Sequence, residues 1–333
     1  MVDLACRWLG LELRSPLIVG ASPLSDSHAK VQTLVEAGAG AVVMRSLFEE
    51  QLIADQMGAH HFFDTHVDTD AEARSFLADS DVFSVSASPI LKRLRRLADE
   101  LPVPVVGSLN GVTPGGWTEY ARQLADAGAA AIELNLYDLA SDTAETGEQI
   151  EQRQLDVVAD VVEAIRVPVS VKISPFYSSV PNFVACLESA GAKGVVMFNR
   201  YYQPDLDLET LDIDRHVVLS TSAELPMRLR ALAVLFGKTN LSLACTGGVH
   251  SGTDVAKALL CGANVVQTVS AVLHDGPSAL TRIHRELTEW LDAHGYEDLD
   301  AVRGATAIDN VANPHEMERL NYAQMLQSWQ SRS

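Results

Sequence analysis

Residues 241–271 read LSLACTGGVHSGTDVAKALLCGANVVQTVSA. Two apolar runs, 241–248 and 264–271, flank a stretch of helical character at 253–260. Continuous apolar runs of this length are typical of parallel strands that are buried on both faces. Gly262 follows the helical stretch, where glycine fits a helix C-terminus because the left-handed backbone carries no Cβ penalty. The segment therefore predicts a strand–helix–strand unit.

The same unit recurs along the chain. Ala-Gly pairs at 37–38, 127–128 and 190–191 again connect a helical stretch to an apolar run. The runs predicted to be strands are residues 17–22, 41–46, 103–110, 131–137, 167–174, 194–200, 241–248 and 264–271. The other predicted helices are residues 29–37, 117–127, 152–165, 182–190 and 227–236. Parallel strands linked by such crossovers indicate an α/β fold, a (β/α)8 TIM barrel. A doubly wound open sheet is the alternative, but the GxGxxG fingerprint expected after its first strand is absent.

Three segments stand outside this repeat. Residues 2–14 precede the first barrel strand and are expected to form a hairpin that closes the barrel floor. Residues 47–99 and 201–226 are insertions after the second and sixth strands. Because barrel active sites lie at the C-terminal ends of the strands, both insertions are expected over the active face. We expect a single domain over residues 1–333, with 47–99 as a lid, since α/β barrels of about 250 residues form one domain.

The charge of the chain limits its partners. Lys and Arg number 25 and Asp and Glu number 44, which gives a net charge of −19. Such a chain repels phosphate backbones and anionic membranes, so neither nucleic acid nor a membrane is an expected partner. A small anionic ligand would need positive charge close to its own site.

The cysteines and the N-terminus indicate a compartment. Cys6, Cys186, Cys245 and Cys261 form no CxxC pair, which argues against an iron–sulfur cluster built by this chain alone and against a disulfide framework. The first residues show no signal peptide, and no apolar run approaches the roughly 18 residues of a membrane span. A cytoplasmic location is expected.

Polar residues end the predicted strands. Since the C-terminal ends of barrel strands share one mouth, we expect these side chains to converge there. Lys172 stands in an otherwise apolar strand, where a buried lysine is rare unless it is paired or functional. It could stabilise a developing anion or serve as a Schiff-base amine, and the structural alternative is an ion pair with Glu133 on the neighbouring strand.

A glycine turn opens a helix after the seventh strand. Residues 246–254 read TGGVHSGTD, and unhindered backbone N–H groups before a helix favour a phosphate group. In barrels, phosphate sites lie after the seventh and eighth strands, where Gly247, Gly248 and Ser270 fall. Residues 60–68, HHFFDTHVD, contain metal-capable side chains, but their spacing matches no closed zinc pattern. A solvated loop or lid without metal is expected there.

Several of these segments resemble the dihydroorotate dehydrogenases, most closely their soluble class. The segments are residues 10–22, 133–136, 171–176, 245–249, 258–263, 267–277 and 295–296. The resemblance implies a (β/α)8 barrel that holds FMN at its C-terminal mouth, and a homodimer. The positions it implies for the cofactor are Ala21, Ser22, Arg45, Ser46, Asn110, Asn135, Lys172, Gly247, Gly248 and Ser270. It places Lys172 near the flavin N1 and the two glycines with Ser270 on the phosphate. The positions it implies for the substrate are Asn135, Asn199 and Arg200.

The chain departs from the family pattern in its substrate half. The family's strand-two lysine is Arg45, a planar cation that would change the contact. The family's loop after strand four carries a catalytic Cys or Ser where this chain has Asp138, and its second Asn is Ala140. The family's Asn-containing substrate loop between strands two and three has no match. Asp138 or Tyr137 is the candidate base, and a helix cap or exposed loop acid is the alternative for Asp138.

The leading hypothesis is an FMN oxidoreductase that acts on a C–C bond next to a carbonyl. Its substrate is other than dihydroorotate, or its specificity is looser than one for dihydroorotate alone. One alternative is a flavin-free phosphosugar aldolase or isomerase with Lys172 as Schiff base. Another is a flavin-binding subunit that passes electrons to a partner. The electron acceptor stays open between a small oxidant and a redox partner protein.

Overall fold

The computed structural model describes residues 2–48, 87–110, 114–137, 140–200, 205–214, 216–311 and 326–327. The barrel strands are β3 (Leu17–Val19), β4 (Ala41–Val43), β6 (Val105–Asn110), β7 (Ala131–Asn135), β8 (Val169–Ile173), β9 (Gly194–Met197), β12 (Ser242–Thr246) and β13 (Val265–Thr268). All neighbours are parallel, and the pairings β13–β3 and β4–β6 close the ring in chain order. The predicted (β/α)8 barrel is confirmed, with each predicted strand in place.

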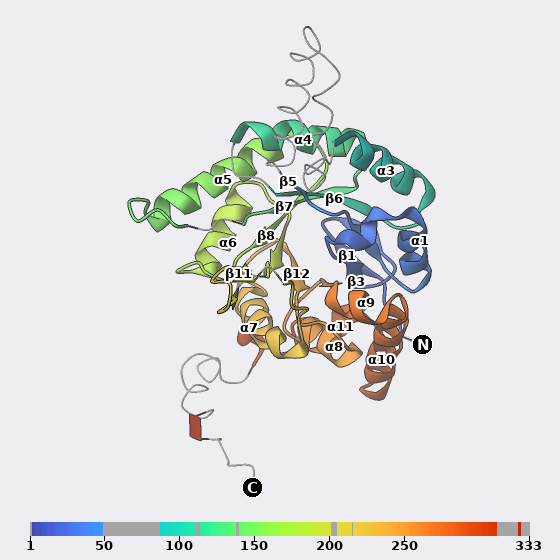
Figure 1. The fold of residues 1–333 in the computed structure, drawn as a ribbon. Coiled ribbons are helices and arrows are strands. Elements are labelled where there is room, and N and C mark those ends of the chain that lie inside the picture. The colour runs from blue at the N-terminus through green and yellow to red at the C-terminus, as the bar shows by residue number, and fades with distance from the viewer. Residues whose placement is uncertain are drawn as a thin grey trace.

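Helices surround the strands as an outer ring (Figure 1). They are α1 (His28–Glu36), α3 (Ala87–Glu100), α4 (Pro114–Asp126), α5 (Gly147–Ala164), α6 (Val180–Ser189), α7 (Leu225–Leu235), α8 (Gly252–Leu260) and α10 (Ser278–Ala293). Short helical segments are η1 (Pro23–Asp26), η3 (Ser222–Glu224), α9 (Ser270–Asp275), α11 (Leu299–Val302) and η4 (Ile308–Asn310). Local signals start several of them: Thr146 and Ser251 form capping boxes at α5 and α8. Among the described helices, none is long and apolar enough to cross a membrane.

The N-terminal hairpin closes the barrel floor, as predicted. It pairs β1 (Cys6–Trp8) with β2 (Leu11–Leu13) in antiparallel fashion. Trp8 is fully buried and belongs to the same apolar cluster as Ile18, Val106 and Val265 of the barrel strands. The Leu9 N–H donates to the hydroxyl of Ser242 at the start of β12, over 3.0 Å. The lower barrel interior is therefore apolar and plugged.

The upper interior is polar. Strand register places Ser108, Glu133 and Ser170 in one layer, and Asn110, Asn135 and Lys172 in the next layer toward the C-terminal mouth. Thr246 and Gln267 pair with each other on the opposite wall. The barrel thus separates an apolar floor from polar groups at its mouth, where barrel sites lie.

The expected insertion over residues 47–99 is shorter than predicted. Its start, β5 (Leu47–Phe48), pairs with β6 beyond the end of β4. Its last part is α3, whose Leu94 and Leu97 are fully buried, so this helix belongs to the outer ring and not to a lid. The part between them, including 60–68, lies outside the described residues. The single domain stays a prediction.

The described part of the second insertion, predicted over residues 201–226, reaches the mouth as expected. Its described part contains an antiparallel hairpin of β10 (Asp205–Leu206) and β11 (Ile213–Asp214). After the hairpin, Val217, Leu219 and Ser220 line the cavity at the C-terminal end of the barrel. The chain then enters η3 and α7.

Candidate functional site

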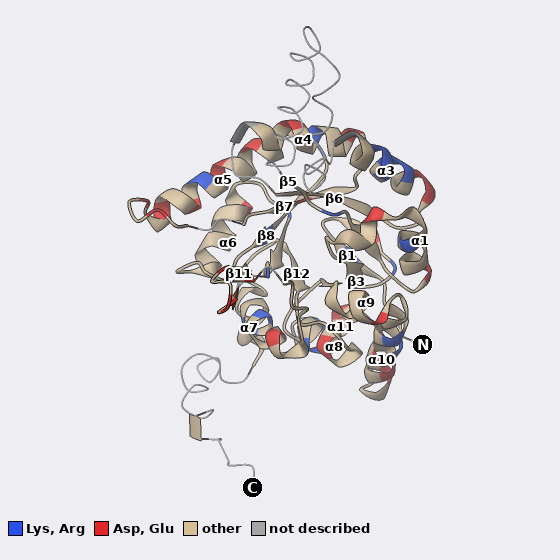
Figure 2. Cartoon of the chain, in the orientation of Figure 1, with Lys and Arg blue, Asp and Glu red and all other residues tan. Residues whose placement is uncertain are grey.

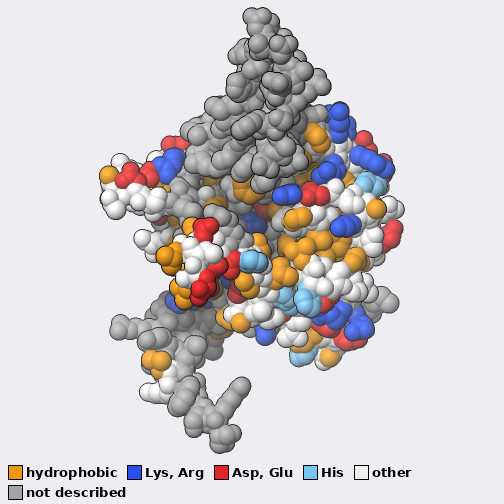
Figure 3. All heavy atoms as spheres, in the orientation of Figure 1, with side chains coloured by type: hydrophobic (Ala, Val, Ile, Leu, Met, Phe, Trp, Pro, Cys, Tyr) orange, Lys and Arg blue, Asp and Glu red, His pale blue; other side chains and the backbone are white. Residues whose placement is uncertain are grey.

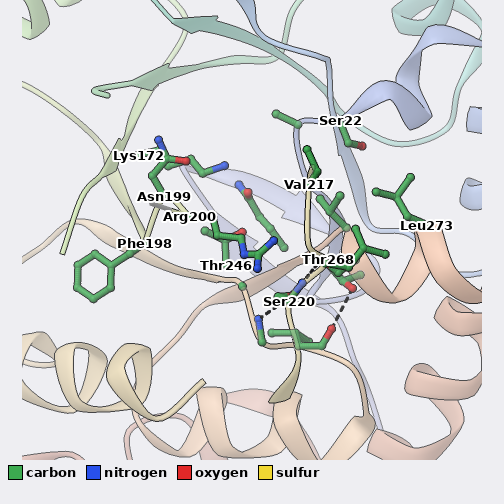
Figure 4. A pocket seen from close by; sticks show the side chains of 18 of the residues that line it. Ser22, Lys172, Phe198, Asn199, Arg200, Val217, Ser220, Thr246, Thr268 and Leu273 are labelled. Atoms are coloured by element: carbon green, nitrogen blue, oxygen red, sulfur yellow. Dashed lines mark hydrogen bonds between the residues drawn. The ribbon is translucent and has the colours of Figure 1, made fainter. Parts of the chain in front are cut away.

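A cavity of about 290 Å³ opens at the C-terminal ends of β3, β8, β9, β12 and β13. Figure 4 shows Lys172, Asn199 and Arg200 on one side of it, across from Ser22 and Leu273. The residues predicted from sequence that line it are Ala21, Ser22, Lys172, Asn199, Arg200, Gly247, Gly248 and Ser270. The expected convergence of the strand ends is therefore observed for these residues.

Two other hollows, of about 440 and 560 Å³, are larger than this cavity. Both are lined by Gly10 and Ser242, so they lie at the opposite end of the barrel beside the N-terminal hairpin. In TIM barrels that end serves stability, while ligands bind at the C-terminal face. We therefore place the site by its converging polar groups and not by cavity size.

Lys172 is the cation at the inner end of the cavity. Its side chain is 11% exposed, and its Nζ lies 3.8 Å from Oε1 of the fully buried Glu133. The ion pair that was the structural alternative is thus present, but this contact is too long for a hydrogen bond. Within the described part of the chain, the Lys172 ammonium makes no hydrogen bond. An ammonium that faces a cavity without a hydrogen-bond partner is available to a ligand.

Two buried oxygens beside Lys172 also lack donors. Nε2 of Gln267 donates to Oε2 of Glu133 over 2.5 Å, yet Oε1 of Gln267 and Oε1 of Glu133 accept no hydrogen bond among the described residues. Buried polar atoms are nearly always paired in native proteins. Because Gln267 lines the cavity, its oxygen could accept a hydrogen bond from an N–H group of a ligand.

The predicted substrate amides lie together. Nδ2 of Asn199 donates to Oδ1 of Asn135 over 2.6 Å. Asn135 is also the register neighbour of both Asn110 and Lys172. Asn199 lines the cavity, and the pair could present amide donors and acceptors to a carbonyl compound.

The glycine turn forms the outer end of the cavity. Gly247 and Gly248 have φ angles of +87° and +80°, a left-handed backbone that glycine adopts without strain. A Cβ on Gly248 would lie 2.6 Å from the backbone nitrogen of Leu225. Ser220 closes the turn from the second insertion: its N–H donates to Oγ of Ser270 over 3.1 Å, and its Oγ lies 3.5 Å from the Gly248 nitrogen (Figure 4).

The start of α8 is already capped. Oδ2 of Asp254 accepts the backbone N–H groups of His250 and Ser251, each over 3.0 Å, and the hydroxyl of Ser222 over 2.8 Å. These donors are therefore not free for a phosphate, contrary to the simple expectation for a helix N-terminus. Gly247, Gly248, Ser220 and Ser270 remain as the polar wall of this end.

Arg228 lies behind the glycine turn and was not predicted. Its buried guanidinium donates from Nε to the carbonyl of Thr246 over 3.0 Å and from Nη1 to the carbonyl of Glu224 over 2.7 Å. Burial lowers the pKa of Arg228, and the nearby Glu224 opposes that shift. No sequence signal marks Arg228, because an arginine in mid-helix ordinarily faces solvent.

The other predicted cations have partners outside the cavity. Arg200 lines the cavity, donates to the carbonyl of Val218, and pairs with Glu224 over 3.2 Å. Arg45 pairs with Asp26 over 3.0 Å and is not among the cavity-lining residues. A contact between Arg45 and a cofactor stays a prediction.

Two of the remaining predicted residues, Ser46 and Tyr137, are described just after the C-terminal ends of β4 and β7. The hydroxyls of Ser46 and Ser108 are hydrogen bonded over 2.8 Å. Tyr137 is the second residue after the end of β7, and Asp138 lies outside the described residues. Among the described residues, no group of three or more His, Cys, Asp or Glu side chains could hold a metal ion. Burial raises the pKa of the Cys245 thiol to about 12, so no thiolate forms there at neutral pH.

Comparison with known proteins adds three kinds of relative. The model of the dihydroorotate dehydrogenase family matches residues 4–291. A putative dihydroorotate dehydrogenase A (fumarate) of Aeropyrum pernix is 31% identical over 218 residues, 64% of this chain and 71% of that protein. The catalytic subunit of dihydroorotate dehydrogenase B (NAD(+)) of Methanosarcina mazei is 29% identical over 89% of this chain and 92% of its own. The NAD-dependent dihydropyrimidine dehydrogenase subunit PreA of Escherichia coli is 22% identical over 95% of this chain and 80% of its own.

Proposed function

Because the chain belongs to the dihydroorotate dehydrogenase family, we propose that it is an FMN-dependent oxidoreductase acting on a carbon–carbon bond next to a carbonyl group. One observation carries the proposal: a single cavity has an ammonium without a hydrogen-bond partner at its inner end and a glycine turn with serine hydroxyls at its outer end. These ends fit the ring and the phosphate of FMN. When bound, FMN supplies the hydride acceptor.

The residues of the chain divide the remaining work. Gly247, Gly248 and Ser270 hold the phosphate, and Lys172 places a positive charge beside the ring. The backbone at Ala21 and Ser22 packs on the ring, and Arg45, Ser46 and Asn110 complete its surroundings. Asn135, Asn199 and Arg200 orient the substrate. Asp138 or Tyr137 takes the proton that leaves with the hydride.

The cofactor is expected to be FMN and not FAD. The cavity has one glycine turn, and the chain carries no dinucleotide fingerprint. Flavin released from the denatured protein should have the mass of FMN. Release of FAD would contradict this prediction, and a colourless protein without the flavin band near 450 nm would instead favour the aldolase alternative with Lys172 as its amine.

Dihydroorotate is expected to be a poor substrate. The family's base is replaced by Asp138 and its second loop Asn by Ala140, and each unmatched buried polar group costs about 1–3 kcal/mol. Two such losses, about 2–6 kcal/mol together, lower kcat/KM by about thirtyfold or more, at 1.4 kcal/mol per tenfold. Orotate formation should be followed anaerobically with a dye acceptor, with the Methanosarcina mazei relative measured alongside.

An Asp138→Asn variant tests whether Asp138 is the base in any oxidation of dihydroorotate. Slow turnover that the substitution leaves unchanged supports the rewritten substrate site. Rapid oxidation of dihydroorotate that disappears in Asp138→Asn would refute the prediction and identify Asp138 as the base.

A second candidate is a flavin-binding subunit that exchanges electrons with a partner protein. The hairpin β10–β11 favours it, because Leu206, Leu208 and Leu211 are 65%, 80% and 83% exposed beside the cavity-lining Val217. Acidic side chains alternate with them at 205, 207, 209, 212 and 214, with one arginine at 215. Figures 2 and 3 show acidic side chains on this hairpin and apolar ones next to them on the surface. Exposed apolar clusters of this kind mark interaction sites.

The isolated chain separates these two functions. Fast turnover of any small dihydro-compound with a dye acceptor would argue against the subunit. Reduction and reoxidation only in the presence of a partner would favour it. A homodimer, which the family resemblance implies, and a cytoplasmic location stay predictions; sedimentation velocity measures the first.

A further inference from the structure

The electrostatic potential at the glycine turn (residues 247–248) is unfavourable for a bound anion, because negative charge surrounds it. The chain carries a net charge of −19, and the nearest carboxylates to the turn include Asp254, which caps α8, and Glu224 at the start of α7. Asp254 is almost fully buried, so water screens its charge poorly. A phosphate at Gly247 and Gly248 therefore needs a local positive charge.

Arg228 is placed to supply that charge. A Cβ built on Gly247 would lie 2.8 Å from Nη2 of Arg228 and 3.2 Å from its Cζ, so the guanidinium packs directly against the outer side of the turn. The Arg228 side chain is 6% exposed, and its ion pair with Glu224 spans 3.8 Å. Glu224 is closer to Arg200, at 3.2 Å, so one carboxylate is shared by two arginines and neutralises the Arg228 charge only in part.

We propose that Arg228 is the electrostatic anchor of the phosphate site: it sets the preference for a phosphorylated flavin over the same ring without phosphate, acting through the turn from behind and without touching the cavity. The inference rests on the proposed function, since it requires FMN at Gly247 and Gly248. It makes Arg228 a positioning and specificity residue and not a catalytic one.

The guanidinium has two separable effects. Its hydrogen bond to the Thr246 carbonyl fixes the backbone where β12 enters the turn, and a neutral side chain that still donates to this carbonyl keeps that effect. Its charge favours only the phosphate dianion, because the ring of riboflavin is neutral. In a variant that keeps a donor to the Thr246 carbonyl, the ratio of FMN affinity to riboflavin affinity therefore reports the charge.

The experiment titrates apoprotein with FMN and with riboflavin and follows the quenching of flavin fluorescence. Arg228→Gln keeps a donor for the Thr246 carbonyl but removes the charge, and the FMN-to-riboflavin affinity ratio should fall about tenfold or more. Arg228→Lys keeps the charge and should retain most of the ratio. Glu224→Gln removes the shared carboxylate, so the ratio should rise, which no merely structural role of Arg228 predicts.

The controls and the contrary outcomes are distinct. Arg14 also donates to backbone carbonyls, those of Val35 and Ala39, but at the far end of α1, so Arg14→Gln should leave the ratio unchanged. Equal weakening of both flavins in Arg228→Gln, or an unchanged ratio, would overturn the inference. If Arg228→Gln does not fold, a ratio in Glu224→Gln that stays level or falls overturns it instead. Wild-type protein that binds neither flavin would refute the proposed function itself, and this inference with it.

Discussion

Replacing Lys172 by methionine is expected to lower the reduction potential of the bound flavin by about 60 mV. Reduction adds negative charge to the cofactor, and Lys172 is the cation at the inner end of the cavity, with only 11% of its side chain exposed. Removing one preorganised group that stabilises a developing anion costs about 2.7–4 kcal/mol, and 1.4 kcal/mol corresponds to about 30 mV for a two-electron couple. Spectroscopic titration against a reference dye measures the potential.

Two further variants separate an effect of the lost charge on the potential from an effect on the fold. Loss of Lys172 leaves the buried Glu133 without its ionic partner, which can itself destabilise the barrel. The double variant Lys172→Met/Glu133→Gln removes both charges and should fold more readily than the single variant. Lys193→Met is the matched control, because Lys193 is exposed at the opposite end of the barrel beside β9. Equal potentials in wild type and Lys172→Met would show that Lys172 is only a structural partner of Glu133.

Gly248→Ala is expected to abolish flavin retention and to lower the free energy of unfolding. The new Cβ would lie 2.6 Å from the nitrogen and 3.0 Å from the Cα of Leu225, and backbone atoms at the start of α7 cannot move aside as a flexible side chain can. The left-handed φ of +80° adds about 1–2 kcal/mol of strain for alanine. Flavin content after gel filtration and a chemical denaturation curve give the two readouts.

Two other glycines separate the causes. Gly276 also has a positive φ, +70°, but its Cβ would meet nothing within 4 Å, so Gly276→Ala tests the strain without the clash. Gly147 has neither a positive φ nor a neighbour within 4 Å, and alanine there should cost nothing. Flavin retention in Gly248→Ala equal to that in Gly276→Ala would contradict the role of the turn in holding the cofactor.

The barrel could be predicted from sequence because its strands are buried on both faces. A strand that touches helices outside and side chains inside has no solvent-facing position, so it reads as a continuous apolar run. The structure ends β3 and β9 before the predicted boundaries, since the polar residues after them belong to the mouth. The sequence does not reveal helix α3 as part of the ring, because charged residues stand on both sides of its buried Leu94 and Leu97.

Some residues of the candidate site could likewise be predicted from sequence, and others could not. Asn135 and Asn199 could be found because each is a polar residue near the end of an apolar run, and Lys172 because it is a cation inside one. Arg228 could not, since the contact with Gly247 depends on how α7 packs beside β12. The pairing of Arg45 with Asp26 likewise depends on tertiary placement of η1, which no local pattern encodes.

The division of the barrel interior into an apolar floor and a polar mouth has an evolutionary consequence. Trp8 and its apolar neighbours contribute stability at one end, and the groups around Lys172 contribute chemistry at the other. Substitutions at the mouth therefore change little of the apolar packing at the floor, which keeps the chain above its stability threshold. A lineage with such a barrel can exchange mouth residues that form no buried ion pair or glycine turn one at a time while the floor packing is kept, so new specificities are reachable by ordinary point mutation.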